Sequence, residues 1–301
     1  MISLYFIFYY LRYAQVPLDE KLRFILRIVF FRLFNDCPLS QFLKANIRLF
    51  DPELVCKFME MPQRLFYDKR LNYTQRSTLV RDHCEFMKHQ FPESINGALL
   101  QFSTFCLAHI VGKSGKSNSL NLRFDFQMEK EGCLNIELTD ISEPIIRCAF
   151  HISKSENNSD GSPYVLKLGC VQSTNSNTLE KLKETTKDFY GLQPRIFVFD
   201  ALKIFCNFLK IDRIEGISSE DHVYNSDKYK KEYGFNYDEL WTFLGLIQQA
   251  DGNFQGSSLL HLKNIDEYPS RKRSEYKHRY ELIAQVQHQI GQIESAHTKS
   301  N

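Results

Sequence analysis

The chain has few of the features that mark a membrane-spanning, secreted or metal-binding protein. Its apolar start, Met1 to Tyr10, is too short to cross a bilayer and is cut off by Arg12. No cation precedes this stretch and no small-residue cleavage site follows it, so we expect no signal peptide. The eight cysteines form no CxxC pair and have no zinc-ligand spacing with histidine. We therefore expect buried free thiols in a reducing cytoplasm and no metal, while the even count leaves disulfides open.

The chain also lacks a large excess of positive or negative charge. The 38 Lys and Arg residues nearly balance the 36 Asp and Glu residues, for a net charge of +2. We therefore expect no specific nucleic-acid binding, and any electrostatic role must come from local patches. The sequence lacks a Walker loop, an HExxH motif, a dinucleotide fingerprint and a Ser/His/Asp hydrolase motif. With 43% hydrophobic residues, the chain can still form a sizeable core in one large or two modest domains.

Hydrophobic periodicity divides the chain into a helical part and a mixed part. Residues 18–110 predict mainly helices, including one that Asp51-Pro52 begins and another over 93–110. After a Gly/Ser/Lys-rich linker, alternating apolar residues predict an antiparallel meander of four strands, at 122–128, 134–138, 146–150 and 164–172. Further elements are expected as helices at 179–189, 196–210, 238–249 and 270–294, and as strands at 213–218 and 258–262.

These elements predict an α+β fold with a helical N-terminal region over 1–110 and a mixed α/β core over 120–295. The sheet is expected to be mixed and mainly antiparallel. Four strands, then helices, then a fifth strand resemble the core of a GNAT-type acyltransferase. That resemblance implies coenzyme A as a cofactor, bound at the helix start that follows residues 187–195. The segment has a single glycine, an additional helix precedes it, and Lys230 in the 229–235 run stands where the family often has a tyrosine acid.

Lys187, Gly191, Gln193 and Arg195 flank the predicted start of the apolar helix at 196–210. Free backbone N–H groups and two cations there would suit a phosphate or carboxylate. The alternative is that Gly191 and Pro194 only build the turn, because proline presets its own φ angle.

His222 follows the short predicted strand at 213–218, and Tyr224 lies two residues further on. A histidine there could serve as a catalytic base or a ligand, or it could simply cap a turn. Asp238 and Trp241, three apart, share a helical face and predict helix capping and core packing.

A basic segment follows near the C-terminus, in residues 268–280 (YPSRKRSEYKHRY). Lys272, Arg273 and Arg279 are candidate ligands for phosphate groups, and the alternative is a solvated helix face. A stripe of Tyr276, Tyr280 and Ile283 is expected to be buried, with Lys272 and Arg279 pointing elsewhere.

Residues 22–34 (LRFILRIVFFRLF) combine bulky apolar residues with arginines. Arg23 and Arg27 share a helical face, so the segment could lie on an anionic membrane surface. Packing against the protein's own core, with the arginines at the rim, is the alternative.

Four segments in this order resemble the VirK/YbjX family of bacterial proteins: TTKDFYGLQPR at 185–195, HVY at 222–224, YDELW at 237–241 and the basic segment at 268–280. The resemblance covers roughly residues 60 to 290. It implies a protein that acts from inside the cell and is tied to the envelope, to virulence and to tolerance of antimicrobial peptides. The ligand-binding role of the basic segment and of Lys187 to Arg195 gains support from this likeness.

Three functions remain open at this stage. The first is an envelope-linked accessory factor that binds an anionic small molecule or a lipid phosphate. The second is a coenzyme A-dependent acyltransferase, and the third is a non-catalytic adaptor at a membrane or protein surface. We expect a cytoplasmic protein with peripheral contact at the inner membrane through residues 22–34; the oligomeric state is left open.

Overall fold

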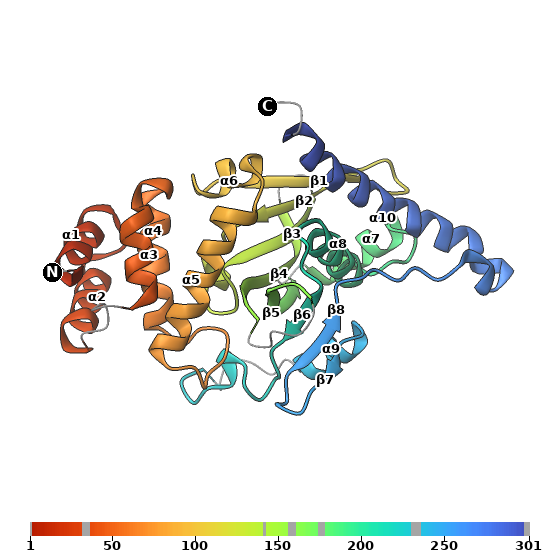
Figure 1. The fold of residues 1–301 in the computed structure, drawn as a ribbon. Helices are drawn as coiled ribbons and strands as arrows, with labels where there is room; N and C mark the ends of the chain where they lie inside the picture. Colours follow the sequence, from red (N-terminus) through yellow and green to blue (C-terminus); the bar gives the residue numbers. More distant parts are fainter. Residues whose placement is uncertain are drawn as a thin grey trace.

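The structure, a computed structural model, describes residues 2–31, 37–140, 143–155, 161–173, 178–229 and 236–297. A central sheet has the N-terminal helices on one side and three later helices on the other (Figure 1). The N-terminal helices are α1 (Ile2–Tyr13), α2 (Leu18–Phe31), α3 (Pro38–Asn46), α4 (Pro52–Glu60), α5 (Tyr73–Gln90) and α6 (Glu93–Leu99). As predicted, Asp51 caps α4: its carboxylate accepts the Glu53 N–H at 2.8 Å, and Pro52 occupies the first turn.

The sheet has eight strands in the order β1-β2-β3-β4-β5-β6-β8-β7. They are β1 (Phe105–Val111), β2 (Ser117–Arg123), β3 (Leu134–Asp140), β4 (Glu143–Lys154), β5 (Tyr164–Ser173), β6 (Arg213–Gly216), β7 (Ile247–Gln248) and β8 (Phe254–Ser257). Neighbouring strands are antiparallel except β5 and β6, which are parallel and joined through α7 (Thr178–Asp188) and α8 (Pro194–Phe208). The predicted α+β class, with a mainly antiparallel mixed sheet after a helical region, is confirmed.

The first strand was missed by the sequence prediction. The helix expected over 93–110 ends at Leu99, and Phe105–Val111 instead forms β1 at the edge of the sheet. Leu107 and Ile110 are buried while His109 and Val111 face outward, a pattern that a short helix would also produce. Pairing with β2 across the turn at 112–116 decides between the two.

Two later elements also differ from expectation. Helix α9 is Tyr237–Phe243, shorter than the predicted 238–249, because Gly245 turns the chain at a φ of +85° before residues of β7. The strand expected at 258–262 lies earlier, at β8. The final helix α10 (Ser270–His297) covers the predicted 270–294.

Helix α10 protects the exposed edge of β1. Gln289 accepts the His109 N–H at 2.9 Å and donates to the His109 carbonyl at 2.7 Å. Gln285, one turn earlier, accepts the Val111 N–H at 3.0 Å. Two glutamine side chains therefore satisfy backbone groups that a neighbouring strand would otherwise satisfy, which blocks edge-to-edge pairing.

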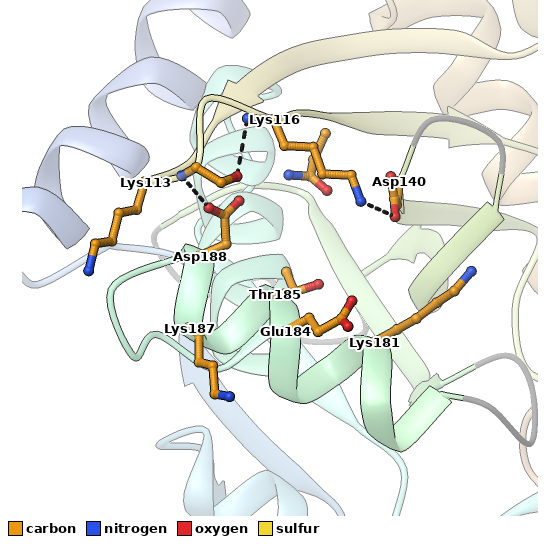
Figure 2. Close-up of a pocket in the computed structure, with 10 residues that line it drawn as sticks. Lys113, Lys116, Asp140, Lys181, Glu184, Thr185, Lys187 and Asp188 are labelled. Carbon is orange, nitrogen blue, oxygen red and sulfur yellow. Dashed lines mark hydrogen bonds and ion pairs between the residues drawn. The ribbon is translucent and has the colours of Figure 1, made fainter.

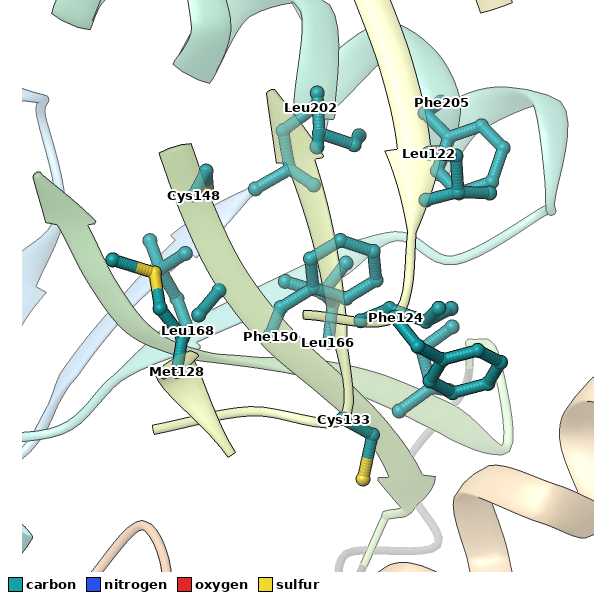
Figure 3. Close-up of a cluster of buried hydrophobic side chains, with 14 of the residues drawn as sticks. Leu122, Phe124, Met128, Cys133, Cys148, Phe150, Leu166, Leu168, Leu202 and Phe205 are labelled. Atoms are coloured by element: carbon teal, nitrogen blue, oxygen red, sulfur yellow. The ribbon is translucent and has the colours of Figure 1, made fainter. Parts of the chain in front are cut away.

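Helix α8 is buried between the sheet and α10, as its apolar character on most sides predicted. Leu202 and Phe205 lie among side chains of the sheet, including Leu122 and Cys148 (Figure 3). All eight cysteines are free, and all but Cys106 are buried. Burial raises the pKa of thiols such as Cys148, which keeps them protonated and unreactive.

Candidate functional site

A pocket of about 490 Å³ opens between the β1–β2 turn, the end of β3 and helix α7. Four lysines and three carboxylates line it together with smaller polar groups. The lining residues are Lys113, Ser114, Lys116, Asn118, Asp140, Lys181, Glu184, Thr185, Lys187 and Asp188. Figure 2 shows Lys113 and Lys187 on one side of this lysine pocket and Lys116 and Lys181 toward the other, with Asp188 and Glu184 between them.

Asp188 holds the wall formed by the β1–β2 turn in place. Its carboxylate accepts the Ser114 N–H at 2.6 Å, and its backbone carbonyl accepts the Lys113 N–H at 2.9 Å. A side chain at Gly112 would overlap the same carboxylate and would have to displace Asp188 from the turn. The end of α7 and the turn are therefore a preformed wall rather than two independent loops.

The lysines differ in how they are held. Lys116 donates to Asp140 at 2.6 Å, which raises the pKa of Lys116, and Lys181 pairs with Glu143. Within the part of the chain that the structure describes, the side chains of Lys113 and Lys187 have no hydrogen-bond or ion-pair partner. These two ammonium groups, on flexible stems, can turn toward a ligand at little cost.

Of the residues predicted to bind a ligand, only Lys187 lines this pocket. Gln193 caps the start of α8 without a side-chain cap bond, Pro194 occupies the first helical position, and Arg195 is half-buried there. Lys187 thus lines the pocket without Gly191, Gln193 or Arg195, and a shared anion site at the α8 start stays a prediction. The turn-building role of Gly191 is real, because its φ is +77°.

Gly191 instead meets Arg279 of α10. A side chain at Gly191 would place Cβ 2.6 Å from the Arg279 guanidinium. That guanidinium donates to the Tyr190 carbonyl at 2.8 Å, pairs with Glu275 and lies 4.5 Å from the ring centre of Tyr276. The expectation that Arg279 points away from the stripe of Tyr276, Tyr280 and Ile283 is wrong, since its guanidinium lies over the Tyr276 ring and also fastens α10 to the loop before α8.

The other predicted basic residues lie at the start of α10. Lys272 is exposed. Arg273 donates to the backbone carbonyls of Tyr268 and Asp266 at 3.0 and 2.9 Å and so fixes the preceding loop. Ile283 is buried, whereas Tyr276 and Tyr280 are only half-buried, which corrects the fully buried stripe that we expected.

His222 and Tyr224 lie inside the protein. The His222 ring, only 2% exposed, accepts the Tyr224 N–H at Nδ1 and approaches the Gly169 carbonyl through Nε2 at 3.2 Å. This geometry is that of the turn cap considered above. His222 as a base stays a prediction, and any substrate would have to reach it through surrounding side chains.

A buried carboxyl group next to His222 was not foreseen. Glu131, 1% exposed, lies 3.4 Å from His222, accepts the Tyr237 hydroxyl at 3.0 Å and accepts the Gln172 amide at 2.8 Å. Burial and the nearby carboxyl raise the pKa of Tyr237, so its hydroxyl remains a donor. These four residues form the buried junction. In the sequence Glu131 belongs to EKEG, which signals only a turn.

The junction fills the place where the parallel strands part. β5 and β6 pair at three positions and no further, the last being Leu168 with Gly216. The next carbonyl, that of Gly169, faces His222 instead. Trp241 is fully buried, as predicted. The cap of α9 is Asn236, whose side chain accepts the Asp238 N–H, while the Asp238 carboxylate accepts the Ser219 N–H at 2.7 Å and so ties the helix to the preceding loop.

Parts of two predicted segments lie outside the residues that the structure describes. The 230–235 part of the acyltransferase-like run lies outside them, as do residues 32–34 of the basic apolar segment. Among the described helices, none has both the length and the apolar character needed to cross a membrane. No group of three or more His, Cys, Asp or Glu side chains suited to a metal ion occurs in the described part of the chain.

Comparison with known proteins identifies relatives across most of the chain. Residues 18–292 match the family described as "Protein of unknown function (DUF535)". The "Uncharacterized protein YbjX" of Escherichia coli K12 is 26% identical over 189 residues, which are 61% of this chain and 56% of that protein. An "Uncharacterized protein" of Haemophilus influenzae is 24% identical over 235 residues, 76% of this chain and 74% of that protein. The chain thus spans little more than half the length of the Escherichia coli relative.

Two solved structures are similar to the chain at a low level. A cAMP-binding acyltransferase from Mycobacterium smegmatis has 7% identity and a TM-score of 0.30, covering 69% of this chain and 60% of its own. A point mutant of that acyltransferase has 9% identity and a TM-score of 0.28, covering 59% and 55%.

Proposed function

We propose, because this chain belongs to the DUF535 family and is similar to YbjX, that it is an accessory protein of the VirK/YbjX type that binds a phosphorylated anion in the lysine pocket. Its link to the envelope, to virulence and to tolerance of antimicrobial peptides is part of the same proposal, as is its action from inside the cell.

The observation that carries the ligand is the lysine pocket itself. Four ammonium groups face three carboxylates, and one of those carboxylates, Asp140, is already paired. Lys113 and Lys187 are left as donors for added phosphate oxygens, on a wall that Asp188 holds in shape. Lysine acts on phosphate as a compact positive charge, so a ligand with two adjacent phosphates would suit two such groups.

Inorganic pyrophosphate tests this proposal directly. At about ten times its dissociation constant it should raise the melting temperature of the protein by about 3 °C, because only the native state binds it. Lys113→Ala with Lys187→Ala should reduce the shift to less than about 1 °C. Differential scanning calorimetry at constant ionic strength measures both.

The matched control is Lys277→Ala, which removes an exposed lysine of α10 outside the pocket. It should keep the full shift. An equal loss in the control would mean that pyrophosphate responds to overall charge, and no shift in the parent protein would contradict a phosphate site.

The acyltransferase remains a second proposal, supported by the parallel β5–β6 pair with α8 in its crossover. If this second proposal is right, acetyl-coenzyme A should raise the melting temperature of the protein and pyrophosphate should not. The contact of Arg279 with Gly191 makes Gly191→Ala, which would displace that guanidinium, a direct test of binding at the α8 start.

The N-terminal helices support a peripheral membrane contact. One face of helix α2 packs against the protein's own core, where it buries Phe24 and Ile28. Its other face exposes Leu22 and Leu26, each 52% accessible, and α1 next to it exposes Phe8 at 69%. An exposed apolar face beside arginines is typical of helices that lie in an anionic bilayer surface.

Leu22→Glu with Leu26→Glu should weaken this contact strongly. The parent protein should sediment with vesicles of phosphatidylglycerol and phosphatidylethanolamine, and the variant should bind at least about tenfold more weakly because two leucines no longer enter the lipid. Leu259→Glu with Leu262→Glu, which changes exposed leucines far along the chain, is the control and should sediment like the parent. A parent protein that stays in the supernatant at low salt would exclude the contact.

A further inference from the structure

A second and larger cavity, of about 780 Å³, shares no lining residue with the lysine pocket. It lies between helix α5, the loop before it, strands β4, β5, β6 and β8, and the β7–β8 turn. We call it the polar cleft. Its size is within the range of small-molecule sites in proteins.

Strand register builds the floor of the polar cleft. Lys167 of β5 pairs with Glu215 of β6, which pairs with Gln255 of β8, so three polar side chains form a row across three strands. Such neighbours point to the same face of a sheet. Thr74 and Thr78 of α5 lie one turn apart on the opposite wall.

Two features of this cleft are costly for folding alone. The Ser153 hydroxyl, 1% exposed, lines the cleft without a hydrogen-bond partner among the described residues. Tyr67, also in the lining, has a φ of +62°, which a tyrosine rarely adopts. Its N–H donates to Lys130 and its carbonyl accepts from Val223, so both sides hold the strained backbone. Unpaired buried groups and strain of this kind gather at binding sites.

Most of the charges in the cleft are paired, whereas Asp251 accepts hydrogen bonds from Asn253. Arg70 meets Asp68 at 2.7 Å and Lys167 meets Glu215 at 2.7 Å. Arg81 meets Asp82 in the same way, at 2.5 Å. An anionic ligand in the cleft would therefore be repelled by the carboxylates that lie beside the cations, and a cationic ligand would be repelled by the cations beside the carboxylates. A hydroxyl group both donates and accepts, so it can use the donor of one partner and the acceptor of the other.

We infer that the polar cleft binds a neutral polyhydroxylated ligand of the saccharide class. Paired Arg/Asp and Lys/Glu groups, threonine and serine hydroxyls, and the amides of Gln249 and Gln255 together supply both donors and acceptors to sugar hydroxyls. The inference does not rest on the lysine pocket or on its phosphate ligand.

The experiment measures binding of glucose, N-acetylglucosamine and maltose by calorimetry, at concentrations up to about 50 mM, which covers millimolar dissociation constants. At least one of these sugars should bind and raise the melting temperature. Ser153→Ala should weaken that binding by about threefold to tenfold, the loss of one hydrogen bond. The free variant should melt no lower than the parent protein, because an unpaired buried hydroxyl has been removed. If Ser153→Ala weakened binding only by disturbing the fold, its melting temperature would fall below that of the parent protein.

Thr78→Ala with Gln255→Ala removes donors and acceptors from the two facing walls and should abolish binding. Gln101→Ala with Thr104→Ala, exposed polar residues outside the cleft, is the matched control and should bind like the parent. The Lys113→Ala, Lys187→Ala protein should also bind sugar normally, so a failed phosphate site and a failed saccharide site can be told apart. No binding of any of the three sugars, or equal binding by the parent and the Thr78/Gln255 variant, would overturn the inference.

Discussion

Replacing Gly169 by alanine should destabilise this protein strongly, although it adds only one methyl group. Gly169 lies in β5 against the segment that carries the buried junction, and a Cβ there would overlap the Glu131 carbonyl oxygen. The obstacle is backbone, which cannot turn aside as a flexible side chain can. We expect a loss of about 3 kcal/mol or more in the free energy of unfolding, at the upper end for added core volume.

Gly97→Ala is the matched control. Gly97 lies within α6, is exposed, and has no atom within 4 Å of where its Cβ would be. Alanine is the better helix former, so this variant should gain about 0.5–1 kcal/mol. Urea unfolding can be followed by the fluorescence of Trp241, the single tryptophan, which is buried beside the junction. A Gly169→Ala protein as stable as the parent would mean that the Glu131 segment does not cross β5 this closely.

Removal of the Glu131 carboxyl group should have the second largest effect. Glu131→Ala leaves the buried Tyr237 hydroxyl and the half-buried Gln172 amide without their acceptor. Each unpaired buried donor costs about 1–3 kcal/mol, so we expect a total loss of about 3 kcal/mol. The same urea titration measures it.

Tyr237→Phe separates the hydrogen bond from the packing. It keeps the aromatic ring between His222 and Trp241, at centroid distances of 4.5 and 5.5 Å, and removes only the hydroxyl. We expect a loss of about 1 kcal/mol, clearly smaller than for Glu131→Ala. Equal losses in the two variants would show that the Gln172 bond contributes nothing and that the junction is weaker than its geometry suggests.

The junction also bears on where activity resides. His222 was the one candidate base in the sequence, and the structure surrounds it with Glu131, Tyr237 and the Gly169 carbonyl. Such a histidine is well placed to hold the chain where β5 and β6 part. His222 lines neither the lysine pocket nor the polar cleft, and these two cavities are better placed to receive a ligand from solvent.

Much of the fold was predictable because its signals are local. Alternating apolar residues between 122 and 172 predicted four strands, and β3, β4 and β5 lie where three of them were expected. The strand expected at 122–128 was misplaced, because β2 is Ser117–Arg123 and Phe126–Met128 forms a 3-10 helix. Asp51 and Pro52 begin α4 as predicted, since a cap depends only on the residues within one turn. The helix predicted over Phe105–Val111 was wrong, because only pairing with β2 and the glutamines of α10 distinguishes a strand from a helix there.

The candidate sites show the same division more sharply. By itself, the sequence determined the α+β class, the apolar helix α8, and a list of cations that included Lys187. Only the tertiary structure decided that Lys187 lines one pocket with Lys113 and Lys116, and that Arg279 closes over Gly191. It alone revealed the polar cleft, whose walls come from segments more than a hundred residues apart in the chain. Periodicity records which face of an element is buried, whereas a site depends on which distant side chains come within a few ångströms, and no local pattern carries that information.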